Sequence, residues 1–348
     1  MQDLLGRIAR LDPSASLGLR VIACFDELIV GSVNTRALLA AAASLAGCAA
    51  GFGQSDPTRV IRVGPKGELL PGPRPALDAA ASASIAVGMT VWLEREGQPL
   101  ANDAIILERL ALAVRIRHGR GPREVDNRRH LGILTDREVP SENRLAAAGA
   151  IGLVASRRYR IVAAPLFAVW SGHPNGPEDV ISTRYGPIHA LVVPETYDAF
   201  DASPSGIGAA TTVVGLHHSF RTALVALRLA QPPAESQVLA DTYGGLVELL
   251  AEAGDDAWHH DAECLDAVAR HVWGMETVAA LVMTQSVREA ARRLGIHHST
   301  LQSRLDTIAA TLGFNPTEGF GRSRLGTAYL QHRMRRSTVL DLPAPSTR

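Results

Sequence analysis

Residues 286–306 read SVREAARRLGIHHSTLQSRLD, and this stretch predicts two short helices separated by a tight turn. Ser286 and Glu289 have the spacing of a capping box, in which the serine oxygen accepts an amide of the first turn and the glutamate reaches back to the serine amide. Gly295 can adopt the left-handed conformation that ends a helix. Ile296 then supplies an apolar side chain for the corner between the two helices.

The second helix of the stretch is expected to begin at His297 or Ser299, either of which can cap it. Apolar side chains then repeat at helical spacing and should face inward: Leu301, Leu305, Ile308 and Leu312. The opposite side of the helix carries short polar groups: Ser299, Gln302, Ser303 and Asp306.

Two helices that meet at such a corner are typical of the helix-turn-helix, which places its second helix in the DNA major groove. We expect residues 298–310 to be this recognition helix. A solvated helix face would carry the same polar residues, but the order of capping box, small Ala291, glycine turn and apolar Ile296 favours DNA contact. Short polar side chains suit base edges, and guanidinium groups suit phosphates. The expected DNA-binding residues are His298, Ser299, Thr300, Gln302, Ser303, Arg304, Arg292 and Arg293.

Two histidine pairs raise the alternative of a metal site. His297 and His298 are adjacent, so on a helix their side chains point about 100° apart, and no further ligand follows at a suitable spacing. The richer cluster is His259, His260, Asp261 and Cys264. Asp261 is expected to begin a helix there, which favours a solvated helix entrance over a zinc site. We therefore expect no metal and no cofactor.

Charge is distributed unevenly along the chain. Residues 275–348 contain ten arginines against five acidic residues, which gives this segment a net charge of +5. The whole chain has 35 basic and 35 acidic residues, so the remainder carries −5. A basic end on a neutral protein is consistent with a DNA-binding module attached to a sensor.

Composition indicates a globular protein of two or three domains, since 46% of the 348 residues are hydrophobic and 20% are charged. Cys24, Cys48 and Cys264 are widely spaced and odd in number, which favours a reducing compartment over a disulfide framework. We expect a cytoplasmic protein without a signal peptide. The uncharged run at 37–55 is mostly alanine, glycine and serine, and is interpreted as a buried helix followed by a glycine turn rather than a membrane span.

Hydrophobic periodicity predicts a mixture of helices and strands upstream of the helix-turn-helix. In the first third, helices are expected at 21–30, 35–48 and 103–118, with strands at 58–63 and 84–93. The segment 119–129 is rich in arginine and glycine and is expected to be a linker.

The middle of the chain also alternates between helix and strand. Helices are expected at 141–155 and 219–229, and strands at 159–164, 188–193 and 205–210. Pro232 and Pro233 should end the last of these helices. From 236 onward the pattern is helical throughout, with helices at 243–252, 261–272, 277–283 and 322–336.

The helix-turn-helix resembles that of the PucR/CdaR-like class of bacterial transcriptional regulators. The resemblance rests on residues that match the class pattern: Ala291, Leu294, Ile296, His297, Ser299, Thr300, Leu301, Arg304 and Leu305. LGF at 312–314 and GRSRL at 321–325 fit as well. The pattern allows asparagine or serine at position 299, and Ser299 is the less usual of the two. His298 also departs from the class, so the base preference is open.

The resemblance also extends upstream of the helix-turn-helix. Residues 206–230, GIGAATTVVGLHHSFRTALVALRLA, are similar to the end of the degenerate GGDEF-like middle domain of these regulators. The first third is similar to a GAF-type sensory domain in the order of its elements. The resemblance thus implies an α+β multidomain protein: a GAF-like domain at 1–118, a linker at 119–129, a GGDEF-like domain at 130–233, a helical domain at 236–336 with the helix-turn-helix at 286–312, and a flexible tail at 337–348.

An enzymatic function is not expected. The chain has no Gly-x-Ser-x-Gly elbow, phosphate loop or dinucleotide fingerprint, and no paired carboxylates follow a Gly-Gly turn as a nucleotide cyclase would need. We expect a DNA-binding transcriptional regulator that forms a homodimer or a higher homo-oligomer and whose upstream domains bind an unidentified small-molecule effector. The alternative is a ligand sensor or dimeric scaffold whose helix-turn-helix no longer binds DNA.

Overall fold

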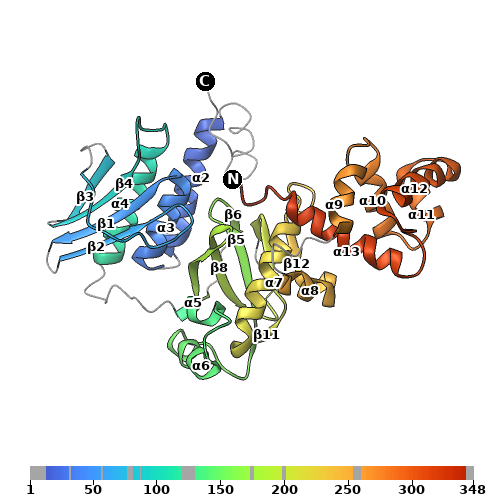
Figure 1. Cartoon of the computed structure of the whole chain (residues 1–348). Helices are drawn as coiled ribbons and strands as arrows, with labels where there is room; N and C mark the ends of the chain where they lie inside the picture. Colours follow the sequence, from blue (N-terminus) through green and yellow to red (C-terminus); the bar gives the residue numbers. More distant parts are fainter. Residues whose placement is uncertain are drawn as a thin grey trace. The chain divides into compact units, whose positions relative to one another are not determined.

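The computed structural model describes residues 13–30, 33–55, 58–76, 81–86, 88–119, 130–172, 176–197, 201–253 and 260–341. The chain forms two compact units, of which the second comprises Tyr243–Thr338 and the first the remainder. The first unit mixes helices and strands and the second is helical (Figure 1), so the predicted α+β class with a helical C-terminal region is confirmed. Most of the predicted linker, 120–129, lies outside the described residues.

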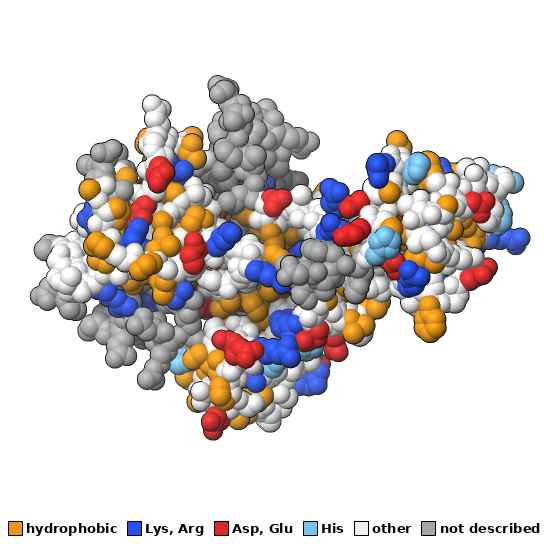
Figure 2. Space-filling model, viewed as in Figure 1, with side chains coloured by type: hydrophobic (Ala, Val, Ile, Leu, Met, Phe, Trp, Pro, Cys, Tyr) orange, Lys and Arg blue, Asp and Glu red, His pale blue; other side chains and the backbone are white. Residues whose placement is uncertain are grey.

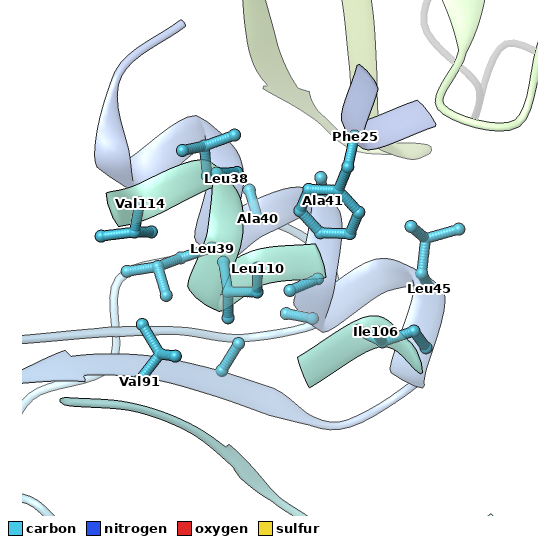
Figure 3. Close-up of a cluster of buried hydrophobic side chains, with 14 of the residues drawn as sticks. Phe25, Leu38, Leu39, Ala40, Ala41, Leu45, Val91, Ile106, Leu110 and Val114 are labelled. Carbon is cyan, nitrogen blue, oxygen red and sulfur yellow. The ribbon is translucent and has the colours of Figure 1, made fainter. Parts of the chain in front are cut away.

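The N-terminal part of the first unit is an antiparallel sheet covered by helices. The strand order is β2 (Thr58–Val63), β1 (Ala49–Ser55), β4 (Met89–Glu94) and β3 (Ser82–Ala86). The helices are α2 (Pro13–Val30), α3 (Thr35–Ala46) and α4 (Asp103–Gly119). In Figure 3, leucine side chains of α3 and α4 lie between these helices and Val91 of the sheet. Alanines occupy much of α3, and their small side chains are fully buried, so this helix contacts the core on several sides.

Two sequence predictions about this sheet are wrong. Strand β1 was expected as part of a glycine turn, and 84–93 was expected as one strand, whereas Gly88 at φ 73° separates β3 from β4. Glycines in β1 made this strand hard to predict from the sequence, and packing against Trp92 explains why they are glycines. A Cβ at Gly51 would lie 2.2 Å from Cε2 of the fully buried Trp92, so only glycine leaves room for the indole.

The middle part of the first unit contains a six-stranded sheet. The order is β12 (Gln237–Leu239), β10 (Ser205–Ile207), β5 (Arg158–Pro165), β8 (Gly186–Pro194) and β7 (Glu178–Thr183), and β11 (Thr211–Thr212) also pairs with β5. Only β10 and β12 run parallel among these pairs. A separate pair joins β6 (Val169–Gly172) to β9 (Asp201–Ser203). The helices are α5 (His130–Thr135), α6 (Ser141–Ala150) and α7 (Leu216–Leu229).

Helix α7 packs directly on the strands of this sheet. A Cβ at Gly206 would lie 2.2 Å from the carbonyl oxygen of Ala223, and one at Gly208 would lie 2.0 Å from that of Ser219. The two glycines therefore permit close contact between strand and helix backbones. The predicted strand at 205–210 is shorter than expected, the helix at 141–155 ends at Ala150, and α5 and β7 were not predicted.

The edge strand β7 joins the two parts of the first unit. It is the last strand in the sheet order, and helix α3 contacts it. The side-chain amide of Asn34 donates to both carboxylate oxygens of Asp179, at 3.3 and 3.2 Å. Ser182 donates to the carbonyl of Gly67, and Val180 belongs to the N-terminal hydrophobic core. The contacts cover an edge that would otherwise be exposed.

The second unit contains six described helices: α8 (Gly245–Glu252), α9 (His260–Val268), α10 (Gly274–Met283), α11 (Val287–Leu294), α12 (His298–Leu312) and α13 (Phe320–Arg335). All were predicted as helical, although α9 ends four residues before the predicted position. The start of α10 packs closely against the end of α9, since a Cβ at Gly274 would lie 2.0 Å from the Val268 carbonyl oxygen. The prediction that the chain is helical throughout from 236 onward is wrong at its start, because Gln237–Leu239 form β12 and pair with β10 of the middle sheet. In the described ranges, no helix combines the length and apolarity needed to cross a bilayer.

Candidate nucleic-acid interface

Helix α11 begins and ends with side-chain and backbone caps. Ser286 Oγ accepts from the amide of Glu289 at 3.2 Å, as the capping box predicts. The return contact differs, because Glu289 Oε2 accepts from the amide of Gln285, at 3.0 Å, rather than from that of Ser286. Gly295 at φ 64° ends the helix, and the amide of Ile296 donates to the Ala291 carbonyl at 3.1 Å. The corner is thus fixed by local hydrogen bonds.

Helix α12 begins at a histidine cap. His297 Nδ1 accepts from the amide of Ser299 at 3.3 Å and lies 2.7 Å from the Ser299 hydroxyl oxygen. Of the two predicted caps, His297 is therefore the one used. The predicted inward stripe is confirmed, because Leu301, Leu305, Ile308 and Leu312 are all buried.

The opposite face of α12 is open to solvent. The predicted base-contacting residues are all exposed: His298, Ser299, Thr300, Gln302 and Ser303. Gln302 Nε2 donates to Asp306 Oδ1 at 3.3 Å, within the same helix face. Helix α12 therefore packs against the second unit through its apolar side and exposes a row of polar side chains on the other side. Their contact with DNA stays a prediction.

The comparison with protein families agrees with this geometry. Residues 275–331, which include α11 and α12 and most of α10 and α13, match the PucR C-terminal helix-turn-helix domain. The chain carries a PucR-type helix-turn-helix. The family match supports a regulatory role over an enzymatic one.

Among solved structures, the chain is similar to a regulator of polyketide synthase expression from Bifidobacterium adolescentis, with 17% sequence identity and a TM-score of 0.26, over 60% of this chain and 98% of that chain. No curated protein matches the chain.

Arginines at the predicted phosphate positions differ in their surroundings. Arg292 and Arg293, in the last turn of α11, are exposed, and within the described part of the chain neither forms an ion pair. Arg304 is instead half-buried. Its Nη1 donates to Thr277 Oγ1 at 3.2 Å, and its guanidinium lies 5.2 Å from the centre of the Trp273 ring. Contact between Arg304 and a phosphate stays a prediction, and the structure adds a contact with α10.

Other arginines of the basic C-terminal segment have partners inside the second unit. Arg322 donates to the carbonyls of Gln285 and Thr284, at 2.8 and 2.7 Å, directly before the Ser286 cap. Arg324 makes two hydrogen bonds to Asp261 and lies 3.8 Å from the Phe314 ring centre. Arg336 donates to Asp266 at 3.0 Å. Sequence charge alone therefore overstated the basic surface, because part of the +5 segment is neutralised by acids that precede it.

The alternative metal cluster has no suitable geometry among the described residues. Cys264 Sγ lies 3.4 Å from His260 Nε2, but Asp261 is paired with Arg324, and His259 lies outside the described residues. No group of three metal-ligating side chains occurs in the described ranges.

Figure 2 shows histidine and arginine side chains, with a few acidic ones, at the outer edge of the second unit where α11 and α12 lie. The PucR-type domain thus presents a mixed polar surface, to which α11 contributes the exposed Arg288, Arg292 and Arg293.

Proposed function

We propose that the protein is a DNA-binding transcriptional regulator in which α12 enters the major groove. The observation that supports this most is the contrast between the two faces of α12. Its apolar stripe is buried against the second unit, while His298, Ser299, Gln302 and Ser303 are exposed on a helix whose start is capped. Such side chains can hydrogen-bond to base edges without burying an unpaired charge.

Phosphate contacts come mainly from α11 in this proposal. Arg292 and Arg293 are exposed at the turn between the two helices, so their guanidinium groups can reach the backbone on either side of the groove. Thr300, in the first turn of α12, is also exposed and can contact a phosphate through its hydroxyl. Arg304 contributes by fixing α12 to α10, and a phosphate contact is its second proposed role.

The upstream domains are proposed to sense a small-molecule effector. We infer a GAF-like domain at 1–118 and a degenerate GGDEF-like domain at 130–233, joined by a linker at 119–129. The antiparallel sheet with its covering helices supports the former, and the six-stranded sheet with α7 supports the latter. The helical domain was predicted to span 236–336, but β12 (Gln237–Leu239) belongs to the six-stranded sheet, so we propose that this domain begins at Tyr243. A tail is proposed at 337–348. The protein is proposed to act as a homodimer, because operators recognised by helix-turn-helix proteins contain two half-sites, and to work in the bacterial cytoplasm, where such operators lie.

The proposal is tested with the full chain and DNA from upstream of its own gene. Fluorescence anisotropy should give a dissociation constant that rises steeply with salt, as expected when counterions are released from phosphates. Unrelated DNA of equal length should bind more weakly. Arg293→Gln should weaken binding to both DNAs, whereas Arg270→Gln, an exposed arginine of the same unit outside α11 and α12, serves as the matched control and should change little.

Absence of salt-dependent binding to any fragment of the host genome would contradict the proposal. That result would favour the alternative of a ligand sensor or scaffold that retains the helix-turn-helix fold without binding DNA.

A further inference from the structure

The first unit contains a cleft between α5, β7 and α7, with a volume of about 600 Å³. This volume is within the range of small-molecule sites in proteins. The cleft lies entirely in the middle sheet and its helices, apart from the helix-turn-helix, and no sequence motif pointed to it.

The inner surface of the cleft is apolar. Ile181 of β7 and Phe220 of α7 line it and are almost completely buried, at 8% and 5% exposure. Ile133 of α5 and Leu224 of α7 also line it and are half-buried. A ligand that fills the cleft would therefore remove apolar surface from water on several sides, and the Phe220 ring favours an aromatic partner.

Hydroxyl groups at the rim of the cleft are arranged as acceptors. Thr135 donates its hydrogen to the Gly132 carbonyl at 3.1 Å, and Ser182 donates to that of Gly67 at 3.0 Å. Thr183 donates to the Gly186 carbonyl at 2.7 Å, and its oxygen also accepts from the amide of Tyr185 at 3.1 Å. A hydroxyl whose hydrogen is committed in this way retains oxygen lone pairs for a ligand. The rim thus selects for a ligand that carries N–H or O–H donors.

The charged residues of the lining balance each other. Arg221 and Asp136 contribute one charge of each sign. A ligand with a full charge would therefore gain attraction to one of them and repulsion from the other. We propose that the cleft binds an uncharged aromatic molecule bearing an N–H or O–H donor.

The cleft is also placed to affect the N-terminal sheet. Ser182, which lines it, donates to Gly67 of the N-terminal part, and Asp179 of the same strand accepts from Asn34. A ligand against β7 therefore contacts the strand that joins the two parts of the first unit. A role in regulation rests on the proposed function, whereas binding itself does not.

The test uses the full chain with indole as the probe and 1-methylindole as its matched control, because the two share a shape and differ in the N–H donor. Calorimetry or saturation-transfer NMR should detect indole binding. 1-Methylindole should bind about fivefold more weakly, since one hydrogen bond is lost. Indole-3-carboxylate should also bind more weakly than indole.

Two variants locate the site. Leu224→Trp on α7 and Ile133→Trp on α5 each enlarge an apolar side chain of the lining and should each weaken indole binding at least tenfold. Leu145→Trp, on the exposed part of α6, is the control and should leave binding unchanged. Thermal melting confirms that the variants fold, and two positions are used so that one unstable variant does not decide the outcome.

The proposal is overturned if the chain does not bind indole, if indole and 1-methylindole bind equally, or if both lining variants bind as the wild type does. None of these results depends on DNA binding, so failure here is distinct from failure of the proposed regulatory function.

Discussion

The guanidinium of Arg304, on the second helix of the helix-turn-helix, lies 5.2 Å from the centre of the Trp273 ring at the start of α10. Its Nη1 also donates to Thr277 one turn further along α10. A cation over an indole ring and a hydrogen bond together hold α12 at a fixed angle on the helix behind it. These contacts with α10 therefore fix the position of the exposed polar face of α12.

Replacement of Arg304 should show how much these contacts with α10 stabilise α12. Arg304→Gln loses the cation–π contact and weakens the bond to Thr277, so the opening free energy of α12 should fall by about 1–2 kcal/mol. Amide hydrogen exchange in the full chain measures this loss. Trp273→Leu should give a loss of similar size that is not additive with the first. Additive losses would show that the two side chains act separately.

Salt dependence separates the two roles proposed for Arg304. If Arg304 also contacts a phosphate, Arg304→Gln should lower the slope of log Kd against log salt by about one. An unchanged slope would leave it with the supporting role alone.

The turn at Gly295 gives a second prediction. Its φ of 64° is strained for side chains with a Cβ, while no atom lies within 4 Å of the position such a Cβ would take. Gly295→Ala should therefore destabilise the helix-turn-helix by about 1 kcal/mol from backbone strain alone, Gly295→Asn by less, and Gly295→Val by more. Hydrogen exchange of α11 and α12 gives the ranking. Equal losses in all three variants would point to a cause other than the left-handed backbone.

Base contact and phosphate contact by the helix-turn-helix can be distinguished by a third comparison. Gln302→Ala and Ser303→Ala remove exposed polar groups of α12, so they should weaken binding to the specific site by about 1–3 kcal/mol and spare binding to unrelated DNA. Arg292→Gln should weaken both and lower the salt slope by about one. Competition anisotropy at two salt concentrations measures these effects. Equal losses on both DNAs for Gln302→Ala would contradict base recognition.

Local signals in the sequence predicted the helix-turn-helix well. Ser286, Gly295 and the stripe from Leu301 to Leu312 act within one or two helical turns, so their spacing alone indicates their role. The return contact of Glu289 was misplaced by one residue, because Gln285 rather than Ser286 donates to it. Which amide donates to Glu289 depends on the backbone conformation before Ser286, and the spacing of residues 286–289 does not determine that conformation.

The features that the sequence did not predict depend on partners distant in the chain. Strand β1 was obscured by Gly51 and Gly53, which are glycines because Trp92 of another strand occupies the space above them. The pairing of Arg324 with Asp261 likewise joins α13 to α9. Strand propensity and net charge do not predict these two contacts, because each contact depends on how distant elements pack against one another.

The bond between Asn34 and Asp179 gives a prediction about the first unit. Asn34 Oδ1 accepts from the amide of Ala37 and so caps α3, while its Nδ2 donates to the carboxylate of Asp179, which is 5% exposed. Asn34→Asp keeps the capping oxygen but replaces the donor by a second carboxylate. It should destabilise the unit by more than Asn34→Ser, which keeps a cap and removes the contact. Denaturant unfolding measures both, and a smaller loss for the aspartate variant would rule out the role of the amide donor.

The buried histidine of α13 gives a prediction about pH. His332 is 7% exposed, and burial lowers its pKa below the ordinary value of 6.5, with Arg335 and Arg336 acting in the same direction and Asp266 opposing them. The unfolded chain therefore takes up a proton at His332 before the folded chain does, so stability is retained above pH 6.5 and falls as the pH drops below it. His118 and His217, whose pKa values burial also lowers, act in the same sense in the first unit. His332→Gln should reduce the loss of stability between pH 7.5 and 5.5, measured by hydrogen exchange of α13 and α9. A variant that loses stability with acid as steeply as the wild type would show that the pKa of His332 does not differ between the folded and unfolded chains.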